Sequence, residues 1–292
     1  MTLISMFMLP TRITMQNNLS SAEVLTESYY DSSDADRFYE QVWGGEDIHI
    51  GLYDETDNIP EASRKTVSMM VDSLRSLNDQ SRVIDLGAGY GGSARYLAKL
   101  AGCKVTCLNI SEVQNSRNRE LTRQQGLDQK VEVRHGSFEE IPCDDASMEI
   151  VWSQDSFLHS SQKEKVLSEI SRIIAPGGEL IFTDPMQADN CPAGVLQPVY
   201  ERLNLESMGS FAFYRETLKA LGFEETKVID LTPQLRNHYD YVRQNLQGRY
   251  DELVAIISHE YMDNMIKGLE NWVAAADKGY LAWGILHFTK SS

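Results

Sequence analysis

The sequence predicts an α/β fold built on an open, mainly parallel sheet. Between Arg82 and Asp184, short apolar runs typical of buried strands alternate with amphipathic stretches typical of helices, which is the pattern of successive βα units. At 83–92 a strand runs directly into a glycine-rich loop and a helix, which supports the same fold. The chain has 292 residues, enough for one large domain or two small ones.

Each expected element follows from a local pattern. Strands are expected where short apolar runs occur, at 83–86, 105–108, 131–133, 148–152 and 180–183. Helices are expected where apolar residues recur at helical spacing, at 93–100, 112–125 and 162–174. After this core, the patterns predict a helix at 214–221, a strand at 226–231, a helical region at 234–276 and a strand at 281–289. The helical region therefore separates the last two strands.

The chain divides into four segments. They are a disordered tail at 1–22, an N-terminal flap with the helices that lead into the sheet at 23–80, the sheet core at 81–233 and 280–292, and a helical lid at 234–279. We expect the lid on the ligand side, because ligands of open α/β sheets bind beyond the carboxyl ends of the strands. The tail contains no acid and one Arg, so organelle targeting stays open beside the expected cytoplasmic location.

The composition excludes several classes of partner. The 27 Lys and Arg against 43 Asp and Glu give a net charge of −16, which disfavours nucleic acid because phosphate binding requires Lys and Arg. No segment has the length and apolarity of a membrane span. Four scattered cysteines predict reduced thiols rather than disulfides or a metal site. The sequence therefore predicts a globular protein that binds a small molecule and no metal.

The strongest motif joins the first strand to the first helix and reads Val83-Ile84-Asp85-Leu86-Gly87-Ala88-Gly89-Tyr90-Gly91-Gly92. Its glycines let a ligand approach the bare backbone, and their spacing also fits a dinucleotide-binding loop. Asp85 favours a cationic aminoacyl group over an anionic pyrophosphate. Asn109 stands where a dinucleotide enzyme is expected to carry an acid, and no Tyr precedes a Lys by four residues. These features favour S-adenosylmethionine, with a nicotinamide-dependent dehydrogenase as the alternative.

On these residues the sequence resembles the class I S-adenosylmethionine-dependent methyltransferases, which have a Rossmann-like sheet. The resemblance covers 82–184 and 281–289, and it rests on the glycine loop, on 105–111 and on 175–180. It implies S-adenosyl-L-methionine as the cofactor. The residues that it places against this cofactor are Asp85, Gly87, Ala88, Gly89, Asn109, Ile110, Gln114, Ser137, Phe138 and Gln154. Core packing is the alternative for Phe138.

Two candidate catalytic residues follow the fourth strand, where a parallel sheet presents groups to its ligands. Asp155 can stabilise positive charge that develops on a nucleophilic nitrogen. His159 can accept a proton, although it can equally serve only to hold the turn before the next helix.

The segment from Tyr29 to Tyr53 carries many aromatic residues among charges and glycines. We expect it to form a flap over the cofactor, with Tyr29 and Trp43 beside the cofactor and Tyr30 at the reacting groups, since aromatic faces attract a sulfonium or ammonium. The alternative is a helix face in which Phe38, Val42 and Trp43 pack on the core, as their spacing also allows.

This segment, together with 153–159, is similar to the sarcosine/dimethylglycine N-methyltransferases of betaine synthesis, over nearly all of 29–290. The resemblance implies successive methylation of sarcosine to dimethylglycine and of dimethylglycine to glycine betaine. Phosphoethanolamine methyltransferases and cyclopropane-forming enzymes share part of the pattern, so methylation of another small amine is an alternative. A non-catalytic methyltransferase-like domain is the alternative from a different class.

A glycine-derived substrate carries a carboxylate, which the planar guanidinium of Arg holds bidentately. Arg215 is the preferred candidate, followed by Arg236 and Arg243, and surface ion pairing is the alternative for each of them. Tyr30 and Asp155 are expected at the methylated nitrogen together with a lid residue, Tyr239. The sequence leaves the oligomeric state open, with a homodimer among the alternatives.

Overall fold

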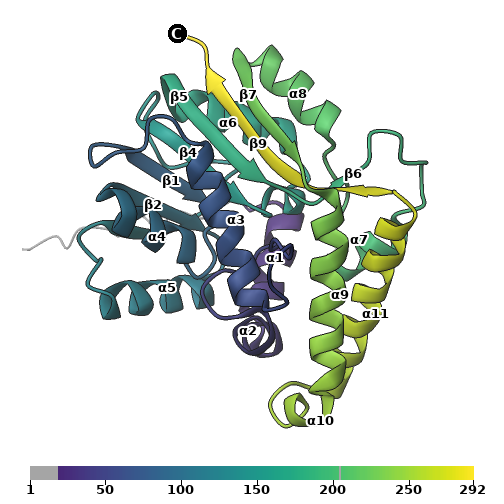
Figure 1. Cartoon of the computed structure of the whole chain (residues 1–292). Helices are drawn as coiled ribbons and strands as arrows, with labels where there is room; N and C mark the ends of the chain where they lie inside the picture. The colour runs from purple at the N-terminus through teal and green to yellow at the C-terminus, as the bar shows by residue number, and fades with distance from the viewer. Residues whose placement is uncertain (1–18, 204) are drawn as a thin grey trace, which may run out of the picture.

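The computed structural model of the chain describes residues 19–203 and 205–292, and a seven-stranded sheet forms the centre of these residues (Figure 1). The strands lie in the order β3-β2-β1-β4-β5-β9-β7. Neighbours among β1 to β5 are parallel, whereas β9 is antiparallel to β5 and β7. This arrangement confirms the predicted fold class. The strands are β1 (Arg82–Leu86), β2 (Lys104–Asn109), β3 (Val131–His135), β4 (Met148–Gln154), β5 (Ile174–Thr183), β7 (Phe223–Asp230) and β9 (Gly284–Lys290), with β6 (Met186–Gln187) paired to β8 (Leu281–Ala282) outside the sheet.

Helices precede, connect and follow these strands. In chain order they are α1 (Ser21–Asp31), α2 (Ser33–Phe38), the π-helical turn η1 (Tyr39–Trp43), α3 (Ile59–Ser73), α4 (Gly92–Ala101), α5 (Glu112–Gln124), the 3-10 turn η2 (Phe157–His159), α6 (Lys163–Ile173), α7 (Gln197–Leu203), α8 (Phe211–Ala220), α9 (Thr232–Gly248), α10 (Tyr250–Leu253) and α11 (His259–Asp277).

Alternate residues of the central strands point to opposite faces of the sheet, and each face is buried under helices. Val83 of β1 packs in the cluster that includes residues of α3 and α4. Its neighbour Ile84 packs on the other face, with residues of α6 and α8. Because both faces are covered, the central strands carry continuous apolar runs, such as 150–152 in β4 and 180–182 in β5, as expected for a parallel sheet.

The helical region between β7 and β8 extends away from the sheet as the antiparallel pair α9 and α11, with α10 at its tip (Figure 1). Its inner face packs against the N-terminal segment, where the Trp43 ring lies 4.7 Å from the ring of His238. Phe38, Val42 and Trp43 are 0%, 3% and 4% exposed. The three side chains therefore pack in a core, as the alternative reading of this segment stated.

The start of α1 corrects the predicted boundary of the tail. Ser20 caps the helix by accepting from the backbone of Glu23, whose carboxylate in turn accepts from the Ser20 amide at 2.5 Å. This reciprocal capping box makes Ser21 and Ala22 helical, so a tail that ends at residue 22 is two residues too long. The rest of the predicted tail, residues 1–18, lies outside the described residues.

Within the described residues, no helix combines the length and apolarity needed to cross a membrane. The four cysteines are free thiols: Cys103 and Cys107 are buried, and Cys143 and Cys191 are partly exposed. The prediction of reduced thiols is consistent with these positions.

A buried carboxylate ties the segment after α3 to the sheet. Glu179 of β5 accepts hydrogen bonds from the backbone of Arg75 and Ser76 and from His287 of β9, the last at 2.7 Å. Burial alone would raise the pKa of Glu179, but the hydrogen bonds from His287, Ser76 and the Arg75 amide outweigh it and lower the pKa to about 2.

We predict that Glu179→Gln lowers the free energy of unfolding by about 1.5–3 kcal/mol, the usual range for hydrogen bonds to a charged group. Because the pKa of Glu179 is lowered by folding, its contribution is full above the ordinary glutamate pKa and is lost as the pH falls toward 2. Urea unfolding between pH 7 and pH 3 measures both effects. The variant should lose less stability on acidification than the wild type, and parallel pH profiles of the two proteins would contradict this role. Glu120→Gln is the control, because Glu120 lies in an exposed ion pair with Arg123.

Candidate active site

The glycine loop after β1 presents its backbone to a cavity at the carboxyl ends of the strands. Gly87, Gly89 and Gly91 have φ angles of 74°, 51° and 74°, a left-handed conformation that glycine adopts without strain. A Cβ atom added at Gly87 would lie 2.2 Å from the hydroxyl of Ser156. The loop after β4 therefore packs directly on the glycine loop, and larger residues have no room there.

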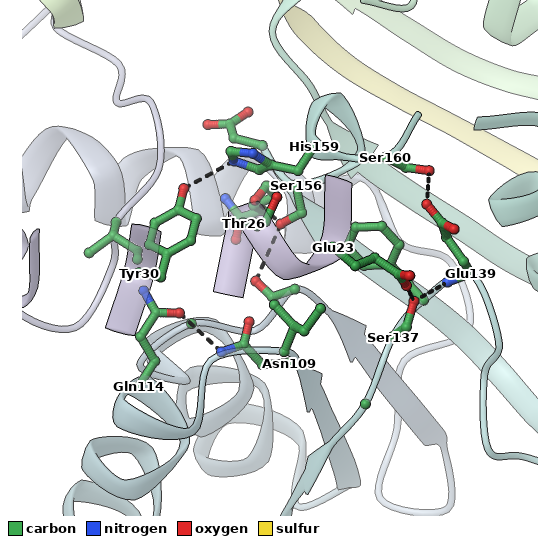
Figure 2. Close-up of a pocket in the computed structure, with 18 residues that line it drawn as sticks. Glu23, Thr26, Tyr30, Asn109, Gln114, Ser137, Glu139, Ser156, His159 and Ser160 are labelled. Atoms are coloured by element: carbon green, nitrogen blue, oxygen red, sulfur yellow. Dashed lines mark hydrogen bonds between the residues drawn. The ribbon is translucent and has the colours of Figure 1, made fainter. Parts of the chain in front are cut away.

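This cavity, here called the main cavity, brings most of the predicted site residues together (Figure 2). The predicted residues that line it are Tyr30, Gly87, Gly89, Asn109, Ile110, Gln114, Ser137, Phe138, Gln154, Asp155 and His159. They come from the ends of β1, β2 and β4 and the residues that follow them, from the loop after β3, and from α1, α5 and η2. The main cavity thus lies at the sheet edge where the sequence predicts the site.

A polar pair stands at the end of β2. The side-chain amide of Asn109 donates to the side-chain oxygen of Gln114 at 3.0 Å. The backbone amide of Gln114 donates to the hydroxyl of Ser111 at 3.1 Å. An amide at Asn109 can offer both a donor and an acceptor to ligand hydroxyls. It takes the place of the acid that a dinucleotide enzyme carries there.

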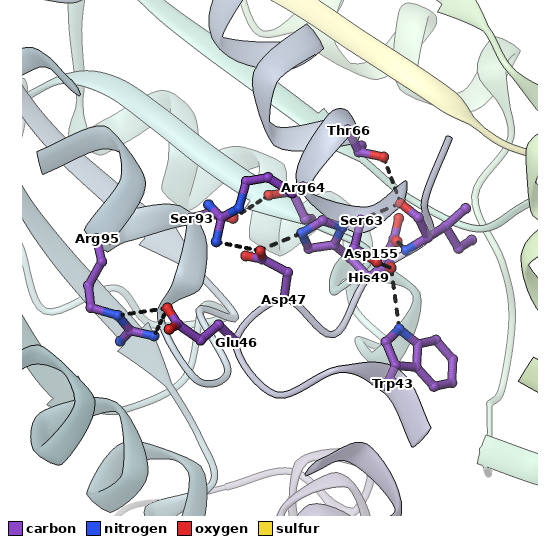
Figure 3. Close-up of polar contacts among 12 residues, drawn as sticks. Trp43, Glu46, Asp47, His49, Ser63, Arg64, Thr66, Ser93, Arg95 and Asp155 are labelled. Atoms are coloured by element: carbon purple, nitrogen blue, oxygen red, sulfur yellow. Dashed lines mark hydrogen bonds and ion pairs between the residues drawn. The ribbon is translucent and has the colours of Figure 1, made fainter. Parts of the chain in front are cut away.

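An acidic lobe adjoins the glycine loop and contains Asp85 and Ala88 (Figure 3 shows its neighbourhood). Burial raises the pKa of Asp85 to about 7, opposed by His49 and assisted by Asp47. Asp47 itself pairs with Arg64 at 2.6 Å, and although burial alone would raise its pKa, His49 and Arg64 lower it. Two carboxylates beside a bare backbone form a suitable environment for a cationic amine.

Helix α1 covers the main cavity. Glu23 and Tyr30 line the cavity from this helix, and Glu23 accepts a hydrogen bond from Ser137 across it (Figure 2). At the other end of the helix, Asp31 accepts from Ser111 at 2.6 Å. Side-chain hydrogen bonds therefore hold α1 to the loops after β2 and β3, which places it as a cover over anything bound below.

Tyr30 and His159 form a hydrogen-bonded pair, with 3.0 Å between the hydroxyl and Nε2 (Figure 2). Burial, followed by the nearby Lys163 and Arg202, lowers the pKa of His159 to about 3. His159 is therefore neutral at physiological pH. Burial raises the pKa of Tyr30, so its hydroxyl keeps its proton.

The turn that carries His159 is held by a residue that the sequence did not single out. Asp184 accepts from the Leu158 backbone at 2.9 Å and from the hydroxyl of Tyr214 at 2.7 Å. Burial raises the pKa of Asp184 to about 7. Because Asp184 secures this turn, the imidazole of His159 is free to face the cavity and Tyr30.

Asp155 adopts a left-handed backbone conformation, with φ 52°, directly after β4. One carboxylate oxygen accepts from the Ile50 amide at 2.7 Å and the other from the indole of Trp283 at 2.8 Å. Burial raises the pKa of Asp155, opposed by His49 and by the two hydrogen bonds. The carboxylate thus faces the cavity from a fixed position.

A second space, here called the inner cavity, lies behind the main cavity and shares Tyr30, Ile48, Asp155 and His159 with it. Its remaining walls are largely aromatic or apolar and comprise Tyr39, Trp43, His49, Ile50, Leu158, Pro185, Arg202, Leu203 and Tyr239. The shared residues therefore form the boundary between the two spaces. A ligand in the inner cavity would therefore contact residues that also line the main cavity.

Arg202 of α7 supplies a cation to the inner cavity, and the sequence analysis missed it. Its guanidinium lies 5.5 Å from the Tyr239 ring and 5.7 Å from the Trp272 ring. Its Nε and Nη1 atoms are buried and have no hydrogen-bond partner among the described residues. In the sequence, Glu206 follows Arg202 by four residues, which is the spacing of an ordinary ion pair within a helix. In the structure, α7 ends at Leu203, so Glu206 is not part of the same helix.

The predicted arginines lie elsewhere, which corrects the expected carboxylate site. Arg215 is partly exposed on α8 and pairs with Glu225 at 2.7 Å. Arg236 and Arg243 both pair with Asp240 on α9, at 2.8 Å and 2.5 Å. None of the three lines the main or inner cavity. Each guanidinium has a carboxylate partner, in the manner of a surface charge.

Two predicted aromatic residues also lie apart from the main cavity. Trp43 lines the inner cavity, and its indole donates to the backbone of His49 at 3.3 Å. Tyr29 turns outward, and its hydroxyl lies 3.4 Å from those of Tyr39 and Tyr261. The expected cofactor contact of Tyr29 is therefore corrected, because helical rotation directs Tyr30 inward and Tyr29 to a groove on the other side.

No group of side chains within the described residues has the composition and proximity of a metal site. The polar groups that face the cavities are carboxylates, amides, hydroxyls, two imidazoles and a guanidinium. These groups can orient an amino acid and balance its charges.

Residues 84–182 match the family model described as a methyltransferase domain. The chain is 54% identical to sarcosine/dimethylglycine N-methyltransferase of Halorhodospira halochloris, over 90% of this chain and 94% of that protein. It is 51% identical to sarcosine/dimethylglycine N-methyltransferase of Aphanothece halophytica, over 90% of this chain and 96% of that protein.

A solved structure shows the same likeness in three dimensions. The fold matches a Galdieria sulphuraria protein provisionally described as a sarcosine dimethylglycine methyltransferase, with a TM-score of 0.85 and 43% identity. The match covers 90% of this chain and 99% of that one. The likeness therefore includes the N-terminal segment and the helices between β7 and β8, which build the cavities, and is not confined to the sheet.

We predict that Asp155→Ala lowers the free energy of unfolding by about 2–6 kcal/mol, since it leaves the Ile50 amide and the Trp283 indole without an acceptor at about 1–3 kcal/mol each. Asp155→Asn retains one acceptor oxygen and should lose less. Urea unfolding followed by tryptophan fluorescence gives the order of the three proteins. Equal stability of wild type and Asp155→Ala would show that the two hydrogen bonds do not support the site.

Proposed function

The chain is a member of the sarcosine/dimethylglycine N-methyltransferase family, and on that premise we propose that it methylates sarcosine to dimethylglycine and dimethylglycine to glycine betaine with S-adenosylmethionine. The observation that carries this proposal is the inner cavity, where the Asp155 carboxylate and the Arg202 guanidinium stand among aromatic rings. The Nε and Nη1 atoms of Arg202 have no hydrogen-bond partner in the part of the chain that the structure describes. A methylated glycine has one charge to match each of them: the carboxylate that it brings and the ammonium that methylation completes.

The residues of the main cavity fit S-adenosylmethionine. The glycine loop offers bare backbone, the acidic lobe at Asp85 suits the ammonium of the methionine part, and Asn109 with Gln114 suits ribose hydroxyls. Phe138 stands on the cavity wall, where its ring can pack against adenine. When bound, S-adenosylmethionine supplies an electrophilic methyl group on a sulfonium.

The protein's part in the reaction is to orient the amine and to balance its charge. Arg202 would hold the carboxylate, and the rings of Tyr30 and Tyr239 would surround the methylated nitrogen. Proximity and alignment can contribute about 7–11 kcal/mol to barrier lowering in such a displacement. Sarcosine and dimethylglycine must lose the ammonium proton before attack, so the site is expected to bind the neutral amine.

Charge at the nitrogen rises as the methyl group arrives, and the surrounding residues favour that change. Asp155 offers a carboxylate, whereas His159 stays neutral because its pKa is about 3. The pair of Tyr30 and His159 therefore adds no positive charge beside the developing ammonium. The site is more complementary to the transition state than to the free amine, which is the requirement for catalysis.

Helix α1 must move for ligands as large as S-adenosylmethionine to enter the main cavity, because it covers that cavity. Its hydrogen bonds, donated by Ser137 to Glu23 and by Ser111 to Asp31, are side-chain contacts that can open without unfolding the sheet. We therefore keep the flap function of this segment in the proposal, with loop or helix opening as the step that admits the cofactor.

We predict that Gly89→Val abolishes binding of S-adenosylhomocysteine. The added side chain would enter the space of the ligand and also meet Ile48, 3.1 Å from the Cβ position, at a φ of 51° that valine avoids. Isothermal titration calorimetry measures the affinity, and circular dichroism establishes that the variant is folded.

The control is Gly126→Val, at a left-handed glycine with nothing within 4 Å of its Cβ position. It carries similar backbone strain and should bind S-adenosylhomocysteine as the wild type does. In the wild type, the ligand should also slow hydrogen exchange in α1. Unchanged affinity in Gly89→Val would remove the cofactor from the glycine loop, and unchanged exchange would mean that α1 is a permanent cover.

We predict that Arg202→Lys lowers kcat/KM for dimethylglycine, because Lys keeps the charge but loses the bidentate fork. The fall should correspond to a loss of about 1.5–3 kcal/mol of transition-state stabilisation. Dimethylethanolamine is the comparison substrate, since it has a similar tertiary amine and no carboxylate. The wild type should strongly prefer dimethylglycine, and the substitution should reduce that preference.

Arg215→Lys is the matched control and should leave both rates unchanged, because Arg215 pairs with Glu225 outside the cavities. Equal turnover of the two amines by the wild type would remove the carboxylate contact and favour another small amine. Preference for phosphoethanolamine would favour the corresponding alternative. Binding of S-adenosylhomocysteine with no turnover of any of these amines would favour a non-catalytic domain.

A further inference from the structure

Gly268 lies in the interior of α11, where glycine is unfavourable. A glycine within a helix costs free energy relative to alanine because it loses more conformational freedom on folding. Gly268 is buried, as are Met265, Leu269 and Trp272 on the same helix. A buried glycine at such a position indicates a close packing contact that a side chain would block.

That contact is the side chain of Arg202, from α7. A Cβ atom added at Gly268 would lie 2.6 Å from Cδ of Arg202 and 2.8 Å from its Cγ. Both atoms belong to the stem of the arginine, so the stem could avoid the new atom only by moving the guanidinium with it. The bare backbone at Gly268 therefore provides the space in which Arg202 lies.

Few other contacts fix the guanidinium. Its Nε and Nη1 atoms have no hydrogen-bond partner within residues 19–203 and 205–292. The rings of Tyr239 and Trp272, at 5.5 Å and 5.7 Å, attract it without setting one position, because a cation over an aromatic face has no directional bond. Packing of the stem against Gly268 is thus the contact that limits where the charge stands.

We propose that Gly268 is a positioning residue for the substrate carboxylate: because it has no side chain, the Arg202 guanidinium reaches its place in the inner cavity. The proposal rests on the proposed function, in which Arg202 binds that carboxylate. Gly268 itself does not line the inner cavity but a groove on its far side, between α1, α7 and α11. It therefore acts on the substrate only through Arg202, and only on substrates that carry a carboxylate.

Gly268→Ala tests this proposal. The expected result is a fall in kcat/KM for dimethylglycine of about tenfold to hundredfold, since a misplacement of about 1 Å has effects of that size. The fall should lie mainly in KM, and the rate with dimethylethanolamine should not change. The affinity for S-adenosylhomocysteine should be unchanged, which shows that the variant is folded and that its cofactor site is intact.

Gly248→Ala is the matched control. Gly248 is the last residue of α9, and nothing lies within 4 Å of its Cβ position, so the same substitution should leave the kinetics with both amines unchanged. Gly268→Ser, with a larger side chain, should raise the KM for dimethylglycine at least as much as Gly268→Ala.

A double-mutant cycle separates this proposal from the proposed function. If Gly268 acts through Arg202, then Gly268→Ala should add nothing to the loss caused by Arg202→Ala. A normal KM for dimethylglycine in Gly268→Ala, beside impaired Arg202→Ala, would overturn the role of Gly268 alone. An equal loss of kcat/KM with dimethylglycine and dimethylethanolamine would also overturn the role of Gly268, because it would indicate a general structural effect. A normal rate in Arg202→Ala would instead overturn the carboxylate contact in the proposed function.

Discussion

The carboxylate of Asp155 is the contact on which the arrangement of the site depends. It accepts from the Ile50 amide at 2.7 Å and from the Trp283 indole at 2.8 Å, so one side chain after β4 joins the N-terminal segment to the residues before β9. Its backbone has φ 52°, a conformation that costs free energy in a residue other than glycine. The two hydrogen bonds from rigid neighbours offset that cost and aim the carboxylate at the cavity.

A second constraint is the separation of Asp155 from Arg202. Both side chains line the inner cavity, yet no ion pair joins them among the described residues. A guanidinium with unsatisfied donors away from water is costly, and direct pairing with a carboxylate would reduce that cost. Tyr39, Trp43 and Tyr239 contribute aromatic rings to the walls of the same cavity. The protein therefore carries a charge arrangement that a dipolar ligand can complete.

The sequence predicts those parts of the molecule that local patterns determine. The strands and the glycine loop at Gly87 depend on neighbouring residues, and the carboxyl ends of parallel strands converge, so Asn109 and Asp155 could be placed at one site. Arg202 could not, because its role arises from α7 meeting α11, a contact that no local spacing encodes. Tyr29 and Tyr30 differ only in helical rotation, which depends on what α1 packs against.

Under the proposed function, selection among amines depends on the charges of Asp155 and Arg202 more than on the reacting nitrogen. Any tertiary amine offers a similar nitrogen to Tyr30 and Asp155, and a hydrophobic pocket discriminates weakly between ligands of similar shape. A ligand without a carboxylate leaves the buried Nε and Nη1 donors of Arg202 unpaired, and buried polar groups left unpaired are the strongest basis for rejecting an analogue. Under the proposed function, the position of one guanidinium, remote from the methyl group, therefore determines which amine is aligned for transfer.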